Sequence, residues 1–369
     1  MNYRPTEIII DEEAIRHNLT CLKNKLGGKD IDIIAVVKAN AYGHGDELVA
    51  SLALRHGASA LAVAIPEEAV KLRKHFKNEP IIILGPSVAS FASYAQAHNI
   101  RITVPSFDAL QALLPYIQPT GPALYIHIKV DSGMGRIGVR TLEEAQMIER
   151  EAMKHNIEVE GIFTHFARAD EKSEMTKHQL AFFRQIVRGL QKRPKIVHAA
   201  NSAASILYES TYFDAVRFGI SLYGIAPSEE VKEMSDFPWK PALTLQSALS
   251  FVKKVPAGTP ISYGSRYVTE KEEWIGTLPI GYADGLSRHL TGQEVLIDGQ
   301  RAPIVGTICM DQCMIRLPKA YPVGETVTFI GKNGQDEIKV EEWSKRLKTI
   351  PYEVLTSLSD RISRRVSEV

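Results

Sequence analysis

Basic and hydroxyl-bearing side chains stand directly after short apolar segments along this 369-residue chain. The first is Lys38, which follows the apolar run 31–37 and precedes Tyr42 and a Gly-His-Gly turn at 43–45. Lysine is seldom buried without a partner, so a lysine that extends from a strand end into water is the ordinary interpretation. A lysine held in a concave, desolvated site would instead be an amine nucleophile that forms Schiff bases. The rest of the chain must decide between the two.

Further polar residues follow later apolar runs in the same way: Lys129 and Asp131, the loop 131–136, Thr164 and His165, Asn201 and Ser202, Arg217, and Gly219 with Ile220. Each has an ordinary interpretation. His165 alone is more often a core histidine, Arg217 a salt-bridge partner, and Ser202 a cap for a helix that begins at 203. Their shared position after apolar runs favours one common site.

The elements that must position these residues alternate regularly. Continuous apolar runs, typical of fully buried parallel strands, are predicted at 31–37, 60–64, 81–84, 101–104, 123–130, 159–164, 195–199 and 213–217. Helical patterns fall near 11–27, 46–56, 66–77, 88–98, 106–115, 141–156, 175–191 and 201–208. Eight such repeats predict an α/β fold, a (β/α)₈ TIM-type barrel with its active site at the carboxyl ends of the strands. A doubly wound sheet is the alternative, but no Gly-x-Gly-x-x-Gly turn follows the first strand.

The pattern changes after Gly224. Residues 225–242 hold three prolines and are predicted to be a linker. Short strands are then expected at 243–255, 274–280, 293–298, 302–308, 312–317 and 325–331, followed by a helical region over 340–366. We therefore expect the barrel over 11–235 and a smaller, mainly-β domain over 236–369.

Composition excludes several classes of protein. A net charge of +1 argues against binding to nucleic acid or a membrane surface, and no apolar run approaches a membrane span. Three cysteines form no disulfide framework, and the chain start lacks a signal-peptide pattern, so a cytoplasmic enzyme is expected. No metal site is expected, because His-Glu-x-x-His is absent and the Cys309/Cys313 pair has no second ligand pair nearby. No Gly-x-Ser-x-Gly elbow is present either.

Two features of the candidate residues together indicate a cofactor. Ser202 and the backbone at Gly219 and Ile220 follow the seventh and eighth predicted strands, where such barrels commonly bind phosphate. Lys38 would lie across the same barrel mouth. A phosphate site and a reactive lysine predict pyridoxal phosphate, whose aldehyde forms a Schiff base with lysine.

The chain resembles the alanine racemase family over nearly its whole length. The most specific match is the segment 35–45, Ala-Val-Val-Lys-Ala-Asn-Ala-Tyr-Gly-His-Gly, which is similar to the family's pyridoxal-phosphate attachment site. Further matches lie at 129–136, 164–166, 201–202, 217–220, 223–224, 262–264, 281–285 and 309–312. The resemblance implies a homodimer in which the β domain of one subunit completes the partner's active site. It also implies that an N-terminal strand within 1–10 packs with that domain.

The resemblance implies roles for individual residues. Lys38 would bind the cofactor as an aldimine and take the α-proton from D-alanine, and Tyr263 of the partner subunit would take it from L-alanine. The cofactor would also be bound by Tyr42, His165, Asn201, Ser202, Arg217, Gly219, Ile220 and Tyr352. Arg136 and the Met310 backbone would bind the substrate carboxylate. Supporting residues would be Lys129 as a carbamate, Tyr282 at the entrance, and Asp311.

These residue types suit racemisation of an amino acid. A guanidinium does not give up its proton, so Arg217 would donate a hydrogen bond to the ring nitrogen and leave that nitrogen unprotonated. That weakens the electron sink and disfavours side reactions. Inversion needs a base on each face of the planar carbanion, and Tyr263 as a phenolate would need nearby cations, for which Arg217 and His165 are the candidates.

Other functions stay open at this point. The enzyme could accept serine as well as alanine, and it could supply D-alanine for peptidoglycan or degrade it. A non-catalytic pyridoxal-phosphate-binding barrel is a further alternative, although it would lack the second domain. A decarboxylase of similar architecture would have an acid in place of Arg217. Thr307 departs from the family, because many relatives carry a basic residue there, and this affects the expected charge of the entrance.

Overall fold

The computed structural model describes residues 3–367 and divides the chain into two compact units. The barrel unit comprises residues 13–41 and 49–240, and the β-rich unit comprises the other described residues, namely 3–12, 42–48 and 241–367. Each unit is described by itself below.

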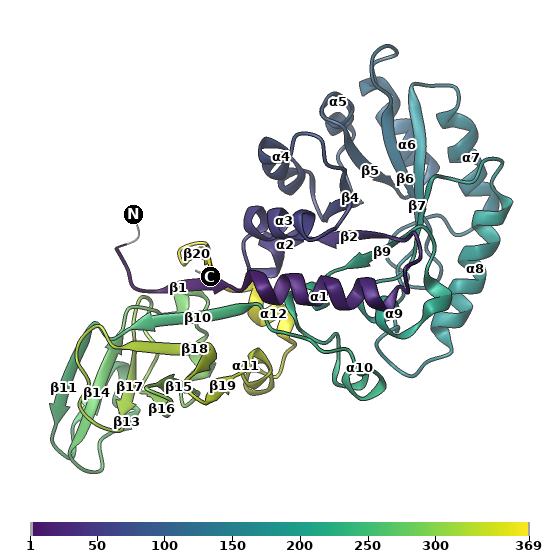
Figure 1. Ribbon diagram of the computed structural model, residues 1–369. Coiled ribbons are helices and arrows are strands. Elements are labelled where there is room, and N and C mark those ends of the chain that lie inside the picture. Colours follow the sequence, from purple (N-terminus) through teal and green to yellow (C-terminus); the bar gives the residue numbers. More distant parts are fainter. Residues whose placement is uncertain (1–2, 368–369) are drawn as a thin grey trace. The chain divides into compact units, whose positions relative to one another are not determined.

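The barrel unit is built on a closed barrel of eight parallel strands, so the predicted fold class is confirmed (Figure 1). The strands are β2 (Asp32–Val36), β3 (Ala60–Val63), β4 (Ile81–Pro86), β5 (Ile100–Val104), β6 (Leu124–Lys129), β7 (Ile157–Phe163), β8 (Ile196–His198) and β9 (Ala215–Phe218). Every residue of β3, β5 and β9 is buried, which explains the continuous apolar run of β3 and the mainly apolar composition of the other two. The order closes when β9 pairs with β2, so all eight carboxyl ends meet at one mouth.

The helical elements are α1 (Glu12–Lys25), α2 (Lys38–Tyr42), α3 (Asp46–Arg55), α4 (Pro66–His75), α5 (Ala92–Ala97), α6 (Phe107–Leu113), α7 (Leu142–Ala152), α8 (Met175–Gly189) and α9 (Ser202–Leu207). They include α1, which precedes the first barrel strand, and α2, whose backbone is left-handed, and the others follow the barrel strands. Side-chain caps fix several starts: Ser106 accepts from the Ala109 N–H, and Thr141 forms a capping box with Glu144. No helix within residues 3–367 has the length and apolar character needed to cross a membrane.

Three stretches differ from their predicted structure. The predicted linker 225–242 contains a short helix, α10 (Glu229–Met234), capped by Ser228. The single strand predicted at 243–255 is two strands, β10 (Leu243–Ala248) and β11 (Phe251–Val255), because the chain turns between them. The helical prediction over 340–366 is wrong at its end, where α11 (Val340–Leu347) and α12 (Pro351–Thr356) are followed by the strand β20 (Ser363–Val366).

The β-rich unit is organised around a ten-stranded sheet, along which the order β11-β14-β17-β16-β15-β18-β10-β1-β20 runs, with β19 paired to β18. The strands not yet bounded are β1 (Glu7–Ile10), β12 (Pro260–Ile261), β13 (Tyr267–Val268), β14 (Glu273–Leu278), β15 (Glu294–Ile297), β16 (Gln300–Val305), β17 (Cys313–Leu317), β18 (Thr326–Asn333) and β19 (Asp336–Ile338). The N-terminal strand β1 lies antiparallel to β10 and parallel to β20 (Figure 1). Ile8 and Ile10 of β1 are fully buried, which anchors the first strand in this unit.

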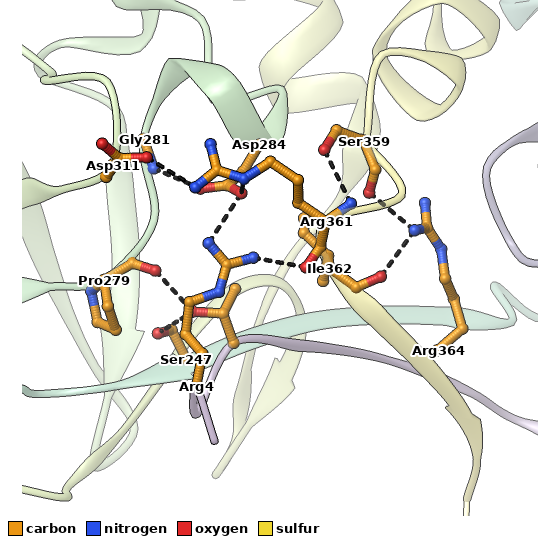
Figure 2. Close-up of polar contacts among 11 residues, drawn as sticks. Arg4, Ser247, Pro279, Gly281, Asp284, Asp311, Ser359, Arg361, Ile362 and Arg364 are labelled. Carbon is orange, nitrogen blue, oxygen red and sulfur yellow. Dashed lines mark hydrogen bonds and ion pairs between the residues drawn. The ribbon is translucent and has the colours of Figure 1, made fainter. Parts of the chain in front are cut away.

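A buried carboxylate ties three distant segments of the β-rich unit together (Figure 2). Asp284 is fully buried and accepts from Arg4 at 2.9 Å and from the Gly281 N–H at 3.0 Å. Arg361 lies 3.6 Å from the same carboxylate and donates to Asp311 at 2.7 Å. The N-terminal segment, the turn 281–285 and the segment after α12 are therefore held by one ionic cluster.

Removing the charge of Asp284 should destabilise the β-rich unit, because Arg4 would keep a poorly solvated charge without its partner. We expect Asp284→Asn to lower the free energy of unfolding by about 2 to 3 kcal/mol. The matched control is Asp298→Asn, which removes the exposed pair with Lys319 and should cost at most about 0.5 kcal/mol. Denaturant unfolding followed by circular dichroism measures both, and equal losses would contradict a special role for Asp284.

Candidate active site

Lys38 leaves the barrel at the end of β2 and enters an unusual turn. Ala39, Asn40, Ala41 and Tyr42 have φ of 51°, 52°, 51° and 52°, so four consecutive non-glycine residues are left-handed. This conformation costs roughly 1–2 kcal/mol per residue, and such strain is found mainly at functional sites. It is held in part by the Ala39 N–H, which donates to Glu68 at 2.6 Å.

Lys38 has an environment that favours the neutral amine. It is half-buried, and burial, followed by the nearby charge of Arg136, lowers its pKa below that of an ordinary lysine. Arg217 acts in the same direction, whereas Glu68 opposes it. The interpretation of Lys38 as a solvent-directed lysine does not fit, because this amine is partly desolvated and surrounded mainly by cations.

Other basic groups lie around the same mouth. Lys129 ends β6 and is 2% exposed, and burial, with the charge of Arg217, lowers its pKa to about 7. Burial together with Arg136 lowers the pKa of Arg217 to about 9. Burial, and next Arg217, lower the pKa of His165 well below its usual value, so His165 is neutral. Burial is the largest cause of each shift, and the further lowering by Arg217 or Arg136 indicates positive charge that an anionic ligand would relieve.

Arg217 is held rigidly by acceptors of the barrel. Its Nη2 donates to the Thr164 carbonyl at 2.7 Å and to the Ala199 carbonyl at 2.9 Å, and its Nη1 donates to His198 Nδ1 at 2.9 Å. His165 Nδ1 lies 3.4 Å from Nη2. Several neutral acceptors thus fix the guanidinium without neutralising it.

The loop that carries Arg136 is shaped by Asp131. Its carboxylate accepts from the Gly135 N–H at 2.9 Å and from the Gly133 N–H at 3.2 Å. Burial alone would raise the pKa of Asp131, but these backbone donors and Lys129 outweigh it and lower the pKa. Asp131 therefore stays ionised and fixes the backbone of the loop that carries the exposed Arg136.

The predicted phosphate residues gather where two short helices begin. Ser202 Oγ accepts from the Gly219 N–H at 2.9 Å, which joins the loops after β8 and β9. The helix cap is Asn201, whose Oδ1 accepts from the Ala204 N–H, so the interpretation of Ser202 as the cap is wrong. Ile220 begins a turn of 3₁₀ helix next to Gly219.

The predicted site residues divide between the two units. The barrel unit holds Lys38, Lys129, Arg136, His165, Asn201, Ser202, Arg217, Gly219 and Ile220, and the β-rich unit holds Tyr42, Tyr263, Tyr282, Met310, Asp311 and Tyr352. Within the β-rich unit the rings of Tyr42 and Tyr352 lie 6.0 Å apart. The pKa shifts and hydrogen bonds described above therefore link only the predicted site residues of the barrel unit.

Tyr263, Tyr282 and Met310 are exposed on rigid supports, with exposed fractions of 73%, 43% and 53%. The Ala283 N–H donates to the Met310 carbonyl, and a Cβ at Gly281 would lie 2.4 Å from that same oxygen. The turn 281–285 therefore fits closely against Met310. Asp284 anchors this turn through the Gly281 N–H, and Gly281 lies beside Asp311 in Figure 2.

Thr307, which was expected to affect the charge of the entrance, contacts the backbone of Tyr263. Its side chain is 7% exposed and donates from Oγ1 to the Tyr263 carbonyl at 2.8 Å. Ser262, with φ of 66°, donates from Oγ to the Thr307 carbonyl at 2.6 Å. Thr307 therefore braces the loop that presents Tyr263.

Sequence reasoning did not identify His198, His127 or Glu160, which are buried and linked to Arg217 by hydrogen bonds. Three titratable residues within apolar strand patterns were the available signal. Neither these three residues nor any other group of His, Cys, Asp or Glu side chains within residues 3–367 is arranged to hold a metal ion.

Comparisons with known proteins agree with this geometry. Residues 10–227 match the family described as Alanine racemase, N-terminal domain, and residues 242–366 match Alanine racemase, C-terminal domain. An alanine racemase of Listeria monocytogenes is 46% identical over 98% of each chain. The crystal structure of an alanine racemase from Bacillus anthracis with bound L-Ala-P superposes with a TM-score of 0.95, at 39% identity over 100% of this chain and 96% of that one. A histidine racemase from Leuconostoc mesenteroides also superposes with a TM-score of 0.95, at 29% identity over 100% of this chain and 99% of that one. The chain belongs to the alanine racemase family.

Proposed function

We propose that this protein interconverts L-alanine and D-alanine with pyridoxal phosphate, and that two bases on opposite faces of the substrate move the α-proton. The observation that carries the proposal is Lys38, a half-buried amine with a lowered pKa beside Arg136 and Arg217. Family membership supports the same reaction.

The residues present fit pyridoxal phosphate. Lys38 would hold its aldehyde carbon, and Arg217 would face its ring nitrogen as a donor. The phosphate would be held by Ser202, Gly219, Ile220, Tyr42 and Tyr352, and His165 and Asn201 would complete the binding site. The cations around the barrel mouth lower the pKa of Lys38, Lys129 and Arg217, which supports an anionic occupant. When bound, the cofactor supplies the electron sink that makes the α-hydrogen of an amino acid acidic.

Lys38 would serve as the base for D-alanine. Its lowered pKa increases the fraction of neutral amine near pH 7, which is the form that accepts a proton. Arg136, together with the backbone at Met310 of the partner subunit, would hold the substrate carboxylate and so place the α-hydrogen in reach.

Tyr263 of the partner subunit would serve as the base for L-alanine. The large exposed side chains on the β-rich unit, Tyr263, Tyr282 and Met310, support a homodimer that buries them. Because His165 is neutral, it is excluded as a cation that stabilises a tyrosinate, and that charge would come from Arg217 and Arg136.

Alanine is the favoured substrate, with D-alanine either supplied for peptidoglycan or degraded. The similar histidine racemase indicates that this fold also accommodates a larger side chain, so serine should be tested in parallel. The three free cysteines support the expected cytoplasmic location.

Lys129 would be a carbamate in the working enzyme. Its neutral amine would attack the carbon of CO₂, form an N–C bond and release a proton, which leaves a carboxylate among the cations. A pKa of about 7 provides enough neutral amine for this step, and the buried cations favour the resulting anion. That anion would also orient Arg136.

The two-base reaction is tested with each alanine enantiomer in deuterated water, by following optical rotation and α-deuterium together. The unchanged enzyme should lose rotation and gain deuterium with either enantiomer. Tyr263→Phe should lower racemisation by about 10²- to 10⁴-fold. This variant should still exchange the α-hydrogen of D-alanine for deuterium with retention of configuration, because Lys38 remains. L-alanine should gain no deuterium. Tyr116→Phe, at an exposed tyrosine before β6, is the control. A cofactor-loaded enzyme that leaves both enantiomers unchanged would favour a non-catalytic binding barrel.

The carbamate is tested by nuclear magnetic resonance with carbon-labelled bicarbonate. A protein-bound carbamate signal should appear near pH 8 and fade below about pH 6, because a lysine with a pKa of about 7 is protonated there. Lys129→Ala should abolish the signal, whereas Lys195→Ala, which removes an exposed lysine paired with Glu158, should retain it. A signal that survives Lys129→Ala would overturn the assignment.

A further inference from the structure

A chain of buried polar side chains crosses the barrel unit behind Arg217. It begins at Arg101 on β5, passes through Glu160 on β7, His127 on β6 and His198 on β8, and ends at Arg217 on β9. We call these five residues the barrel relay. All five are 8% exposed or less, so their hydrogen bonds do not exchange freely with water.

Both ends of the barrel relay fix the direction of its hydrogen bonds. Arg217 can only donate, and it lies 2.9 Å from His198 Nδ1, which must therefore accept. Glu160, once ionised, can only accept, and its Oε2 lies 3.3 Å from His127 Nε2, which must therefore donate. The remaining contact, His127 Nδ1 to His198 Nε2 at 2.9 Å, is then a bond from His198 to His127.

The charge states agree with this direction. Burial lowers the pKa of His127, and burial together with Arg217 lowers that of His198, so each imidazole is neutral and carries one proton. Burial alone would raise the pKa of Glu160, but hydrogen bonds from His127 and Arg101 outweigh it and lower the pKa to about 2. The charged groups that face the two imidazoles are Arg101 and Glu160 at one end and Arg217 and Lys129 at the other.

The backbone is shaped to accommodate the barrel relay. The register between β6 and β7 shifts so that Ile126 faces Val159 and His127 faces Gly161, which leaves Glu160 as an extra residue in a bulge. Bulges redirect side chains and disrupt strand pairing, so they persist where that redirection is used. A Cβ at Gly161 would lie 2.4 Å from His127 Nδ1, so only glycine leaves room for the imidazole. Phe163 stacks on His198 at 4.8 Å and 8°.

We propose that Glu160 is a positioning residue for Arg217, because it fixes the tautomers of His127 and His198 so that Nδ1 of His198 is always an acceptor. The consequence of this positioning for catalysis rests on the proposed function. Arg217 is held as a charged donor with a fixed orientation at the place where the cofactor ring nitrogen would lie. An Nδ1–H tautomer of His198 would direct an N–H group at Arg217 and remove that bond. An Nδ1–H tautomer of His127 would instead make two N–H groups face each other between the imidazoles.

The direct test is nitrogen nuclear magnetic resonance on the full-length protein with labelled histidine, which reports the protonation of each ring nitrogen. His127→Gln and His198→Gln assign the two signals among the 11 histidines. Both residues should be neutral Nε2–H tautomers, unchanged between about pH 6 and pH 8. A charged form, or an Nδ1–H tautomer at either residue, would overturn the proposal. No substrate is involved, so this outcome is independent of whether the protein racemises alanine.

The role of Glu160 is tested with Glu160→Gln. The amide nitrogen of glutamine is a donor, and it would face the N–H groups of His127 or Arg101, which are also donors. We expect the His127 and His198 signals to change, and kcat for alanine to fall about tenfold or more while KM changes less than about twofold. The matched control is Glu149→Gln at another buried carboxylate, which accepts from the Gln191 and Lys192 N–H groups and should leave both signals and kcat unchanged. Unchanged histidine signals in Glu160→Gln would contradict the proposal. If that variant does not fold, the tautomers of the unchanged protein still decide it.

Discussion

Concentrated positive charge in a desolvated space is the constraint on which the barrel mouth depends. Lys38, Lys129 and Arg217 lower each other's proton affinity directly or through Arg136, and burial is the largest cause in each case. Such an arrangement would be costly in a protein with no anionic ligand, since unpaired buried charge is unfavourable. The structure tolerates it because neutral carbonyls and imidazoles, not carboxylates, hold Arg217 in place.

The local strain beside Lys38 belongs to the same arrangement. Four left-handed residues follow the lysine, and a right-handed turn would direct the chain differently out of β2. The cost is offset where the chain is tied down, at Glu68 on one side and, in the β-rich unit, at Gly43, whose carbonyl accepts from Arg364. A Cβ at Gly43 would lie 2.1 Å from the Leu355 carbonyl, so the turn also needs glycine at this point. The strained turn and the partial burial therefore both involve Lys38.

Much of this was predictable from sequence, for physical reasons. Uninterrupted apolar runs identify buried parallel strands, and polar residues after them identify the barrel mouth. Strand β20 was not predictable in this way, because Ser363, Arg364 and Arg365 show no apolar pattern and the strand exists only by pairing with β1. The left-handed turn was equally hidden, since Ala-Asn-Ala-Tyr carries no glycine signal. The barrel relay was missed because a bulge, which sequence does not reveal, directs Glu160 toward His127.

The central claim is that Lys38, and no other buried lysine at the mouth, forms the Schiff base with pyridoxal phosphate. The most direct measurement is to load the full-length protein with pyridoxal phosphate, reduce it with borohydride, and map the modified peptide by mass spectrometry. We expect a single pyridoxyl group on Lys38, because its amine is half-buried and accessible whereas Lys129 is 2% exposed and donates to the Val130 carbonyl. A pyridoxyl group on Lys129, or spread over surface lysines with Lys38 unmodified, would contradict the claim.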